Sequence, residues 1–251
     1  MSQQLNITAL KELDPQAIGP VVQDRSSYFQ IKRILDLILA ISALILLSPL
    51  MLLIAIMVVI DSPGPAIIVQ MRIGARQCFR DGHNFWQQVS FPFFKFRTMW
   101  VDASHLVHQQ FIDAYIAGDE AEMAKIQTDP ESQTKHKLVN DPRVTRVGKI
   151  LRKTSLDELP QIWNVIKGEM SLVGPRPPLP YEVEKYRLWH FQRLTTLPGI
   201  TGLWQVSGRS STSFDEMVSL DLKYIKKQSI WRDIKILIKT IPAVLSGKGA
   251  E

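Results

Sequence analysis

The stretch that decides the fold of this chain is LILAISALILLSPLMLLIAIMVVI, residues 37–60. Its 24 residues include no charged side chain. A helix of this length rises roughly 36 Å at about 1.5 Å per residue, which is enough to span a hydrocarbon core about 30 Å thick. It is not a secretory signal, because charges of both signs precede it and no small-residue cleavage site follows it. The sequence therefore predicts a membrane segment.

A proline divides this segment near its middle. Pro49 has no N–H, and its ring clashes with the carbonyl of Ile45, so a helix is expected to kink here. The hydroxyl of Ser48 can bond to a carbonyl that the proline frees one turn earlier. We expect two half-helices of about 18 Å each, separated at Ser48-Pro49.

Basic residues flank the segment on both sides. Lys32 and Arg33 precede it, and Arg72, Arg76, Arg80, Lys95 and Arg97 follow it. Because Lys and Arg favour the cytoplasmic side, we favour a re-entrant hairpin that returns to the side it entered. The alternative is a single Pro-kinked spanning helix. Asp36, one turn after Lys32, is expected at the depth of the membrane interface.

The composition of the whole chain is typical of a folded protein. Of the 251 residues, 45% are hydrophobic and 22% charged, which excludes a disordered or collagenous chain. The single cysteine, Cys78, excludes a disulfide framework and a multi-cysteine zinc site, and it favours a reducing compartment. A net charge of +6 indicates an anionic partner such as phosphate, acidic lipid or nucleic acid.

We predict three regions: a loosely ordered tail at 1–28, a re-entrant membrane helix hairpin at 29–60 and a cytoplasmic domain at 61–251. The domain is predicted to be α/β, mostly helical with a few short strands. Residues 67–69 and 91–99 are predicted as strands, with a hairpin tip around Asp81-Gly82. Within an insertion at about 100–140, residues 102–131 carry seven acidic side chains and one lysine, which is typical of a solvated helical excursion.

The C-terminal segment 214–245 is expected to form an amphipathic helix, because its apolar residues recur at helical spacing among lysines. Such a helix either packs on the core or lies at the interface of an anionic membrane. The sequence leaves both interpretations open.

One of three Asp-Glu pairs stands out by its surroundings. A run of cations precedes Asp157-Glu158, and Arg176 follows it. Carboxylates that attack or position phosphorus need cations or a metal nearby, because an anionic phosphate otherwise repels them. The alternative is a solvated helix start, since Ser155 and Glu158 have the spacing of a capping box.

Lys95, Arg152 and Arg176 are candidate phosphate-binding cations, and solvation at the surface is their alternative. The chain has no Walker A loop, no Gly-x-Gly-x-x-Gly and no Asp-x-Asp pair. A soluble glycosyltransferase or NTPase is therefore not expected.

Seven ordered blocks resemble a known family, the bacterial sugar transferases, also called monotopic phosphoglycosyl transferases, in their exopolysaccharide and O-antigen branch. The blocks cover roughly residues 30–248 and are Lys32-Arg-x-x-Asp36, Ser48-Pro49, Phe94–Met99, Asp141–Gly148, Leu151–Gln161, Ser171–Pro177 and Pro198–Arg209.

The resemblance implies transfer of a hexose 1-phosphate from a UDP-hexose, glucose or galactose, to undecaprenyl phosphate with release of UMP. This reaction initiates exopolysaccharide, O-antigen or capsule assembly at the cytoplasmic face of the bacterial inner membrane. In the family, the residue matching Asp157 forms a phosphosugar intermediate, and the one matching Glu158 assists it. The resemblance also implies Mg²⁺ at Asp157, with Glu158 as a second candidate ligand, and phosphate binding by Lys95, Arg152 and Arg176.

The expected partners are UDP-hexose, undecaprenyl phosphate, membrane lipid and a second copy of the chain, with no nucleic acid. Two other functions stay open from the residues: a non-catalytic membrane-anchored scaffold, and a hydrolase of lipid-linked sugars.

Overall fold

Helices form most of the chain in the computed structural model, which describes residues 26–80, 83–101, 106–127, 141–207 and 212–246. The α-helices are α2 Ser26–Asp61, α3 Leu106–Ala117, α4 Glu120–Ile126, α5 Arg146–Thr154, α6 Gln161–Lys167, α7 Pro180–Val183, α8 Leu203–Ser207, α9 Phe214–Lys226 and α10 Ile230–Leu245. Two short 3₁₀ helices are η2 Leu156–Glu158 and η3 Leu188–Leu194. The strands are β1 Ile67–Arg80, β2 His83–Phe96, β3 Ser171–Val173 and β4 Gly199–Thr201. The mostly helical prediction is confirmed.

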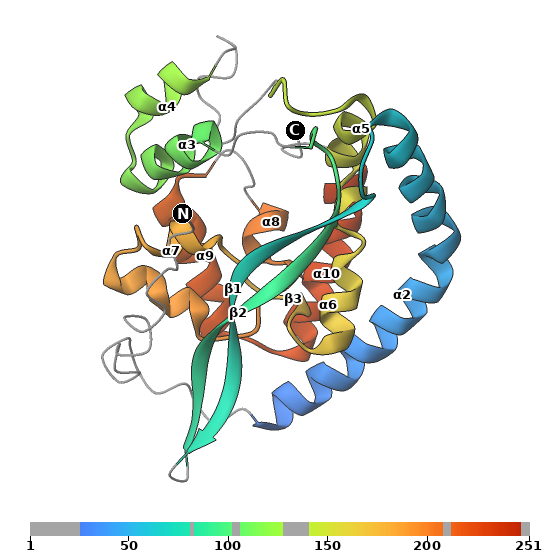
Figure 1. Cartoon of the computed structure of the whole chain (residues 1–251). Helices are drawn as coiled ribbons and strands as arrows, with labels where there is room; N and C mark the ends of the chain where they lie inside the picture. Colours follow the sequence, from blue (N-terminus) through green and yellow to red (C-terminus); the bar gives the residue numbers. More distant parts are fainter. Residues whose placement is uncertain (1–25, 81–82, 102–105, 128–140, 208–211, 247–251) are drawn as a thin grey trace.

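The predicted membrane segment forms a single long helix. α2 runs without interruption through Pro49, and Figure 1 shows it curving around the outside of the body. Ser48 Oγ donates a hydrogen bond of 2.9 Å to the carbonyl of Ile45, the acceptor that Pro49 leaves unpaired. The two separate half-helices are thus not seen, because this bond lets the helix continue through the proline. The helix begins at Ser26 rather than at residue 29, and residues 1–25 of the predicted tail lie outside the described chain.

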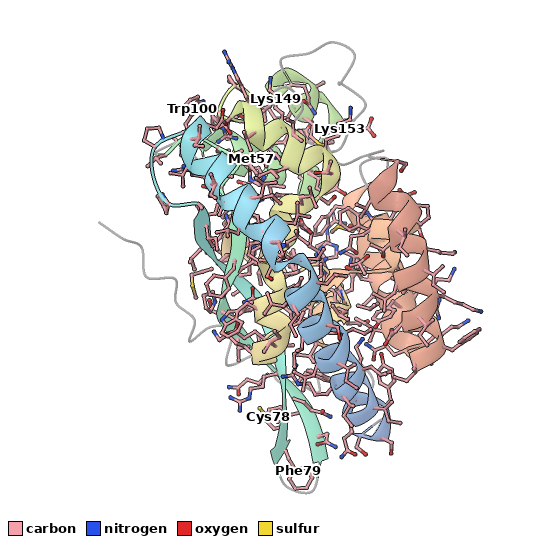
Figure 2. The ribbon with its side chains drawn as sticks, turned by 90° about the vertical axis from the view of Figure 1, so that its right-hand side faces the viewer. Met57, Cys78, Phe79, Trp100, Lys149 and Lys153 are labelled. Atoms are coloured by element: carbon pink, nitrogen blue, oxygen red, sulfur yellow. The ribbon has the colours of Figure 1, made fainter. Side chains whose placement is uncertain are left out.

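One narrow face of α2 packs against the domain, and the rest is exposed. Its buried residues are Lys32, Asp36, Ala40, Ile54 and Val58. Large apolar side chains cover the opposite face; Ile45, Leu46 and Ile60 are each exposed by more than 70%. Figure 2 views the molecule from this side. By length and composition α2 can cross a membrane.

The N-terminal end of α2 is tied to the domain by polar contacts. Lys32 Nζ lies 2.9 Å from Asp233 Oδ2 on α10, and Arg33 donates to the carbonyl of Ile166 at the end of α6. Asp36 Oδ1 accepts a hydrogen bond of 3.2 Å from the N–H of Leu172 on β3. These residues, predicted as an interfacial flank, are therefore bonded into the domain.

The C-terminal end of α2 is tied to the same domain. Asp61 Oδ2 accepts a hydrogen bond from the N–H of Val147, the second residue of α5. Arg97, after β2, donates to the carbonyl of Pro63 at 2.7 Å. Ile54 and Val58 pack with Phe96 and Leu151 in one apolar cluster. Both ends of α2 thus contact a single domain.

The predicted hairpin is confirmed, with longer strands than expected. β1 and β2 pair antiparallel from Ile67 opposite Phe96 to Arg80 opposite His83. The expected tip at Asp81-Gly82 lies outside the described residues. Figure 1 shows one end of the hairpin projecting from the body, while the other end lies near α5. This pairing carries Lys95 into the domain.

The acidic segment is helical as predicted, but the expectation of a solvated excursion is wrong. Phe111, Tyr115 and Met123 of α3 and α4 are buried with Phe214 and Val218 of α9. The acidic residues take the outer positions; Asp119 caps α4 by accepting a hydrogen bond from the N–H of Glu122. The segment therefore completes the largest apolar cluster among the described residues.

The C-terminal segment is two helices rather than one. α9 ends at Lys226, and α10 starts after Ser229, whose side chain caps it. Ser213 and Glu216 form a capping box at the start of α9. α10 buries Ile236 in a cluster with Val173 of β3 and Tyr224 of α9. The core-packing interpretation thus holds for one face of α10.

Candidate active site

The carboxylate of Asp157 is paired with a lysine from a distant strand. Asp157 Oδ2 lies 2.9 Å from Lys95 Nζ, and the two side chains are 7% and 19% exposed. Asp157 sits in η2, while Lys95 is the last residue but one of β2. The site thus contains an anionic group that is mostly withdrawn from water and has one cation beside it.

A strained residue places this carboxylate. Ser155 has φ of 56° and is the one non-glycine residue with positive φ in the described part of the chain. It ends α5 and starts η2, so the backbone turns sharply just before Asp157. Ser155 makes no side-chain capping hydrogen bond, so the alternative of a capping box with Glu158 is wrong. Such left-handed residues often occur at functional sites, where surrounding structure maintains them.

Glu158 points to a different partner. Arg176 donates from NH1 to Glu158 Oε1 at 2.7 Å. The charge of Glu158, partly offset by burial, raises the pKa of Arg176 above its ordinary value. The two neighbouring carboxylates therefore contact cations from two separate segments.

Arg152 lies close enough to Asp157 to interact with it electrostatically. Burial lowers its pKa, whereas Asp157 and Asp141 act in the opposite direction. Asp141 itself forms a fork with Arg143, whose Nε donates to Oδ1 at 2.8 Å and to Oδ2 at 3.0 Å. Burial alone would raise the pKa of Asp141, but the hydrogen bonds from Arg143 lower it more. Of the cation run predicted from the sequence, Arg152 thus interacts with Asp157, whereas Arg143 pairs with Asp141 and Arg146, Lys149 and Lys153 are exposed.

The loop that carries Arg176 is fixed through its carbonyl groups. Prolines at 175, 177 and 178 have no N–H to form hydrogen bonds of their own. Three donors from two other elements, η3 and β1, bind three successive carbonyls: Arg193 that of Arg176 at 3.2 Å, Arg72 that of Pro177 at 2.9 Å, and the N–H of Ile73 that of Pro178 at 3.0 Å. The position of the Arg176 side chain therefore depends on β1 and η3.

Arg193 is itself held in the core. Its Nε donates to Asp221 Oδ2 at 3.0 Å, and its NH1 donates to the hydroxyl of Tyr186 at 2.8 Å. Arg193 and Asp221 are almost completely buried. Burial raises the pKa of Asp221 to about 6 although Arg193 opposes this shift. The ion pair links the apolar cluster around α9 to the Arg176 loop.

Sequence reasoning missed three residues of this network. Arg72 was read only as a basic flank, and Glu182 and Arg193 were not singled out. Burial raises the pKa of Glu182, and Arg72, Arg193 and Arg176 near it act in the opposite direction. The missed signal was the set of prolines at 175, 177 and 178. A loop with few N–H groups of its own needs hydrogen-bond donors from other segments for its carbonyls.

The donor set fits a magnesium ion only together with a substrate. Among the described residues no three His, Cys, Asp or Glu side chains gather into a metal-binding group. Mg²⁺ commonly takes one or two carboxylates and completes its shell with substrate phosphates and water. Asp157 and Glu158 meet that lower requirement, since they are neighbouring carboxylates with Lys95 and Arg176 beside them.

The structure brings five of the predicted residues into one site: Lys95, Arg152, Asp157, Glu158 and Arg176. Ser48 and Pro49 lie near the middle of α2, and Lys32, Arg33 and Asp36 lie toward its N-terminal end. A buried carboxylate with three cations near it has the chemistry that a displacement at an anionic phosphorus centre needs.

Comparison with known proteins gives a consistent picture. The sequence model of the family described as "Bacterial sugar transferase" matches residues 27–247. Over 226 residues, 90% of this chain, it is 43% identical to the "Undecaprenyl-phosphate galactose phosphotransferase" of Salmonella typhimurium, covering 42% of that protein. Over 236 residues, also 90%, it is 39% identical to the "UDP-glucose:undecaprenyl-phosphate glucose-1-phosphate transferase" of Xanthomonas campestris, covering 41% of that protein.

A shorter relative matches along most of its length. The "Exopolysaccharide production protein ExoY" of Sinorhizobium fredii is 42% identical over 219 residues, which are 87% of this chain and 87% of that protein. This chain therefore spans less than half of several curated relatives that it matches, but nearly all of ExoY.

Proposed function

We propose that this chain, which belongs to the bacterial sugar transferase family, transfers a hexose 1-phosphate from a UDP-hexose to undecaprenyl phosphate and releases UMP. This step would initiate an exopolysaccharide, O-antigen or capsule at the cytoplasmic face of the inner membrane. The printed names of two relatives specify galactose and glucose, which supports these two sugars as candidates. The observation that carries the proposal is Asp157, paired with Lys95 at 2.9 Å and surrounded by arginines.

In the first step, an oxygen of Asp157 attacks the phosphorus that bears the sugar. A bond from this oxygen to phosphorus forms, and the bond from phosphorus to the bridging oxygen breaks, so that UMP departs with the electron pair. Lys95 and Arg152 offset the negative charge that otherwise keeps the carboxylate and the diphosphate apart. Arg176, held by its fixed loop, can bind a phosphate with its planar fork.

In the second step, an oxygen of undecaprenyl phosphate attacks the same phosphorus, and the bond to Asp157 breaks. Glu158, next to Asp157, is placed to receive a proton from the lipid phosphate. The two displacements replace one transfer between two bulky anions. Magnesium held by Asp157, Glu158 and the substrate phosphates would neutralise further charge on the diphosphate.

The lipid acceptor requires a site at the height of the membrane headgroups. We propose that α2 enters the membrane and returns to the same side, because both of its ends are bonded to one domain. A helix that crosses once would separate Lys32 from the domain that holds Asp233. The curvature of α2 in Figure 1 and its exposed apolar face support the same placement.

Cysteine labelling tests this placement. In a Cys78→Ser background, Ser27→Cys marks the start of α2, and Lys149→Cys marks the domain. The proposal expects a membrane-impermeant maleimide to leave both unlabelled in intact spheroplasts and to label both after lysis. Labelling of Ser27→Cys alone in intact cells would establish a single crossing instead.

The reaction is tested by measuring UMP release from detergent-solubilised protein with magnesium, undecaprenyl phosphate and UDP-glucose or UDP-galactose. We expect release that needs the lipid and is lost in Asp157→Asn. Asp119→Asn is the matched control, because Asp119 also begins an Asp-Glu pair but only caps α4, a role that Asn fulfils equally well. A scaffold would give no release, and a hydrolase would release sugar phosphate without the lipid.

The covalent intermediate is tested separately. Incubation with UDP-sugar in the absence of lipid acceptor should raise the mass of the native chain by one sugar phosphate, and the peptide that contains Asp157 should carry it. Retention of the adduct in Asp157→Asn would assign the nucleophile to another residue.

A further inference from the structure

The surface formed by the end of α9 and the whole of α10 carries one sign of charge. Its cations among the described residues are Lys223, Lys226, Lys227, Arg232, Lys235 and Lys239. The two acidic residues in 219–246 are both buried in ion pairs, Asp221 with Arg193 and Asp233 with Lys32. Both acidic side chains of this segment are therefore buried, and the exposed side of these helices carries the lysines.

The exposed side of α10 is also apolar. Trp231, Ile238 and Ile241 are each exposed by more than 60%, and Ile234 by 37%. Steps of three and four residues keep these four on one face of the helix. Lys235 Nζ lies 5.3 Å from the centre of the Trp231 ring, and Lys235 and Lys239 flank the apolar face on one side. An apolar face with a lysine rim is typical of helices that lie in a membrane interface.

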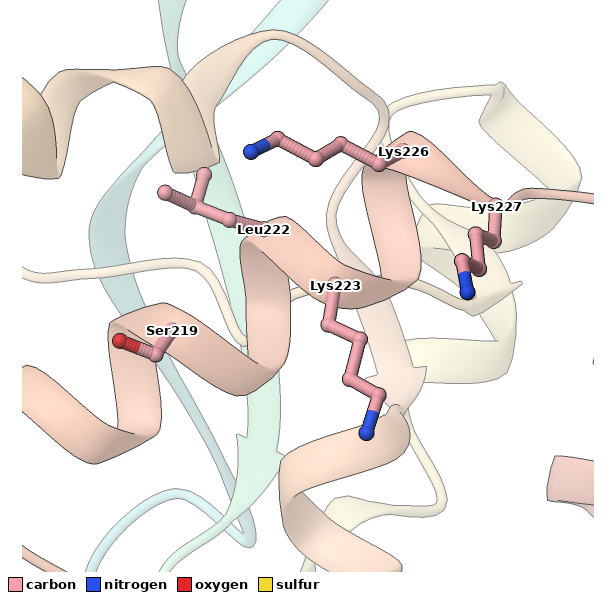
Figure 3. Close-up of a pocket in the computed structure, with 5 residues that line it drawn as sticks. All are labelled: Ser219, Leu222, Lys223, Lys226 and Lys227. Carbon is pink, nitrogen blue, oxygen red and sulfur yellow. The ribbon is translucent and has the colours of Figure 1, made fainter.

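A basic pocket continues this surface onto α9. It is lined by Ser219, Leu222, Lys223, Lys226 and Lys227. In Figure 3, Lys223 and Lys227 project to the same side of the helix, whereas Lys226 extends toward Leu222. None of the residues that line this pocket belongs to the site around Asp157.

The position of α10 relates this surface to the membrane. Asp233, in the first turn of α10, pairs with Lys32 and also accepts a hydrogen bond of 2.9 Å from the hydroxyl of Tyr28. Both partners lie at the start of α2, before its uncharged segment. The start of α10 is therefore at the level where α2 enters the apolar phase, which is the level of the lipid headgroups.

From these observations we infer that the α9–α10 surface, residues 219–241, docks on anionic phospholipid headgroups. The inference rests on the proposed membrane placement of α2. The apolar face of α10 enters the acyl boundary, and the lysines contact headgroup phosphates. Basic residues near an anionic surface gain free energy that falls off within a Debye length, so the contact depends on salt.

The test uses the full chain in nanodiscs of three parts phosphatidylcholine to one part phosphatidylglycerol. Only one of the two lipids carries brominated chains in each sample. The quenching of Trp231 is taken as the difference between the native chain and Trp231→Phe. We expect brominated phosphatidylglycerol to quench at least twice as strongly per lipid as brominated phosphatidylcholine, and high salt to remove the preference.

Two variants separate the charges from the fold. The variant Lys223→Gln, Lys227→Gln, Lys235→Gln, Lys239→Gln should quench equally with both lipids. The control Lys125→Gln, Lys185→Gln removes two exposed lysines next to the acidic residues Glu122 and Asp113 of the insertion, and it should retain the preference. Equal quenching by both lipids in the native chain would overturn the inference. An absence of quenching together with two protein chains per nanodisc would also overturn it, because the α9–α10 surface would then contact a second copy of this chain.

Activity gives a second readout. UMP release by the native chain should be a few fold higher with phosphatidylglycerol than in pure phosphatidylcholine, and the four-lysine variant should lose this gain while keeping its basal rate. A rate that is the same in both lipids would count against the docking surface alone. No release in either lipid, with selective quenching intact, would count against the proposed reaction alone.

Discussion

The guanidinium of Arg193 donates a hydrogen bond of 3.2 Å to the main-chain carbonyl of Arg176, the residue that binds Glu158. Arg193 is completely enclosed by Asp221, Tyr186 and the apolar cluster of α9, and it makes no contact with the dyad itself. It therefore acts as a positioning residue, through the loop that carries Arg176.

We expect Arg193→Lys to fold, because it keeps a charge opposite Asp221, but to lose the fork that also reaches Arg176. The value of kcat/KM for the UDP-sugar should fall about 10-fold, which corresponds to about 1.4 kcal/mol of transition-state stabilisation. Thermal unfolding measured alongside separates this effect from loss of fold. The control Arg187→Lys alters an exposed arginine and should leave kcat/KM unchanged.

Lys95→Met should lower kcat by at least about 100-fold, because the cation next to Asp157 is needed when the anionic diphosphate approaches. Steady-state UMP release and the yield of the covalent adduct both measure this loss. Lys149→Met, at an exposed position of α5, is the matched control. A rate within twofold of the native enzyme would show that Lys95 does not assist the nucleophile.

Substitutions at Ser155 should follow the left-handed conformation of its backbone. Ser155→Gly should keep most of the activity, since glycine adopts positive φ without a clash. Ser155→Val should lose roughly 1–2 kcal/mol of stability and much of the activity, because a branched side chain opposes this conformation and displaces η2. Chemical unfolding and UMP release measure the two effects. Equal behaviour of the two variants would mean that the turn tolerates another conformation.

The Asp141–Arg143 fork predicts a pH-dependent contribution to stability. The native pKa of Asp141 lies below its ordinary value, so the carboxylate stabilises the folded state above about pH 4 and this contribution is lost as the pH falls through the native pKa. Asp141→Asn should therefore cost about 1–2 kcal/mol at pH 7. Thermal unfolding of both proteins between pH 7 and pH 3 should show the gap closing in acid. If the difference in stability between the two proteins stayed constant with pH, the charge of Asp141 would not be its cause.

Local patterns were sufficient to predict the long apolar helix and to single out Asp157-Glu158. An uncharged run of 24 residues has few alternatives to a membrane, and the carbonyl that Pro49 frees at Ile45 could be matched in advance with the hydroxyl of Ser48. Asp157-Glu158 could be singled out among three Asp-Glu pairs because cations precede it in the sequence, and one of them, Arg152, interacts with Asp157. The roles proposed for the individual residues come from the family resemblance.

Expectations failed where burial depends on distant segments. The number of acidic residues in the insertion indicated a solvated segment. Its apolar residues Phe111 and Tyr115 are nevertheless buried, because they pack with Phe214, about 100 residues later in the chain. Residues 214–245 looked like one helix because the apolar spacing continues across the break at Lys227–Ser229.

By itself, the sequence determined that this chain has a bent apolar helix and a carboxylate pair among cations, since both depend on neighbours within a few turns. Only the tertiary structure decided that Lys95 pairs with Asp157, that Arg193 fixes the Arg176 loop, and that Lys32 joins α2 to Asp233. These contacts link segments far apart in the chain. Their partners are selected by the cost of leaving a charge or a carbonyl buried and unpaired, and that cost arises only once the domain has closed around them.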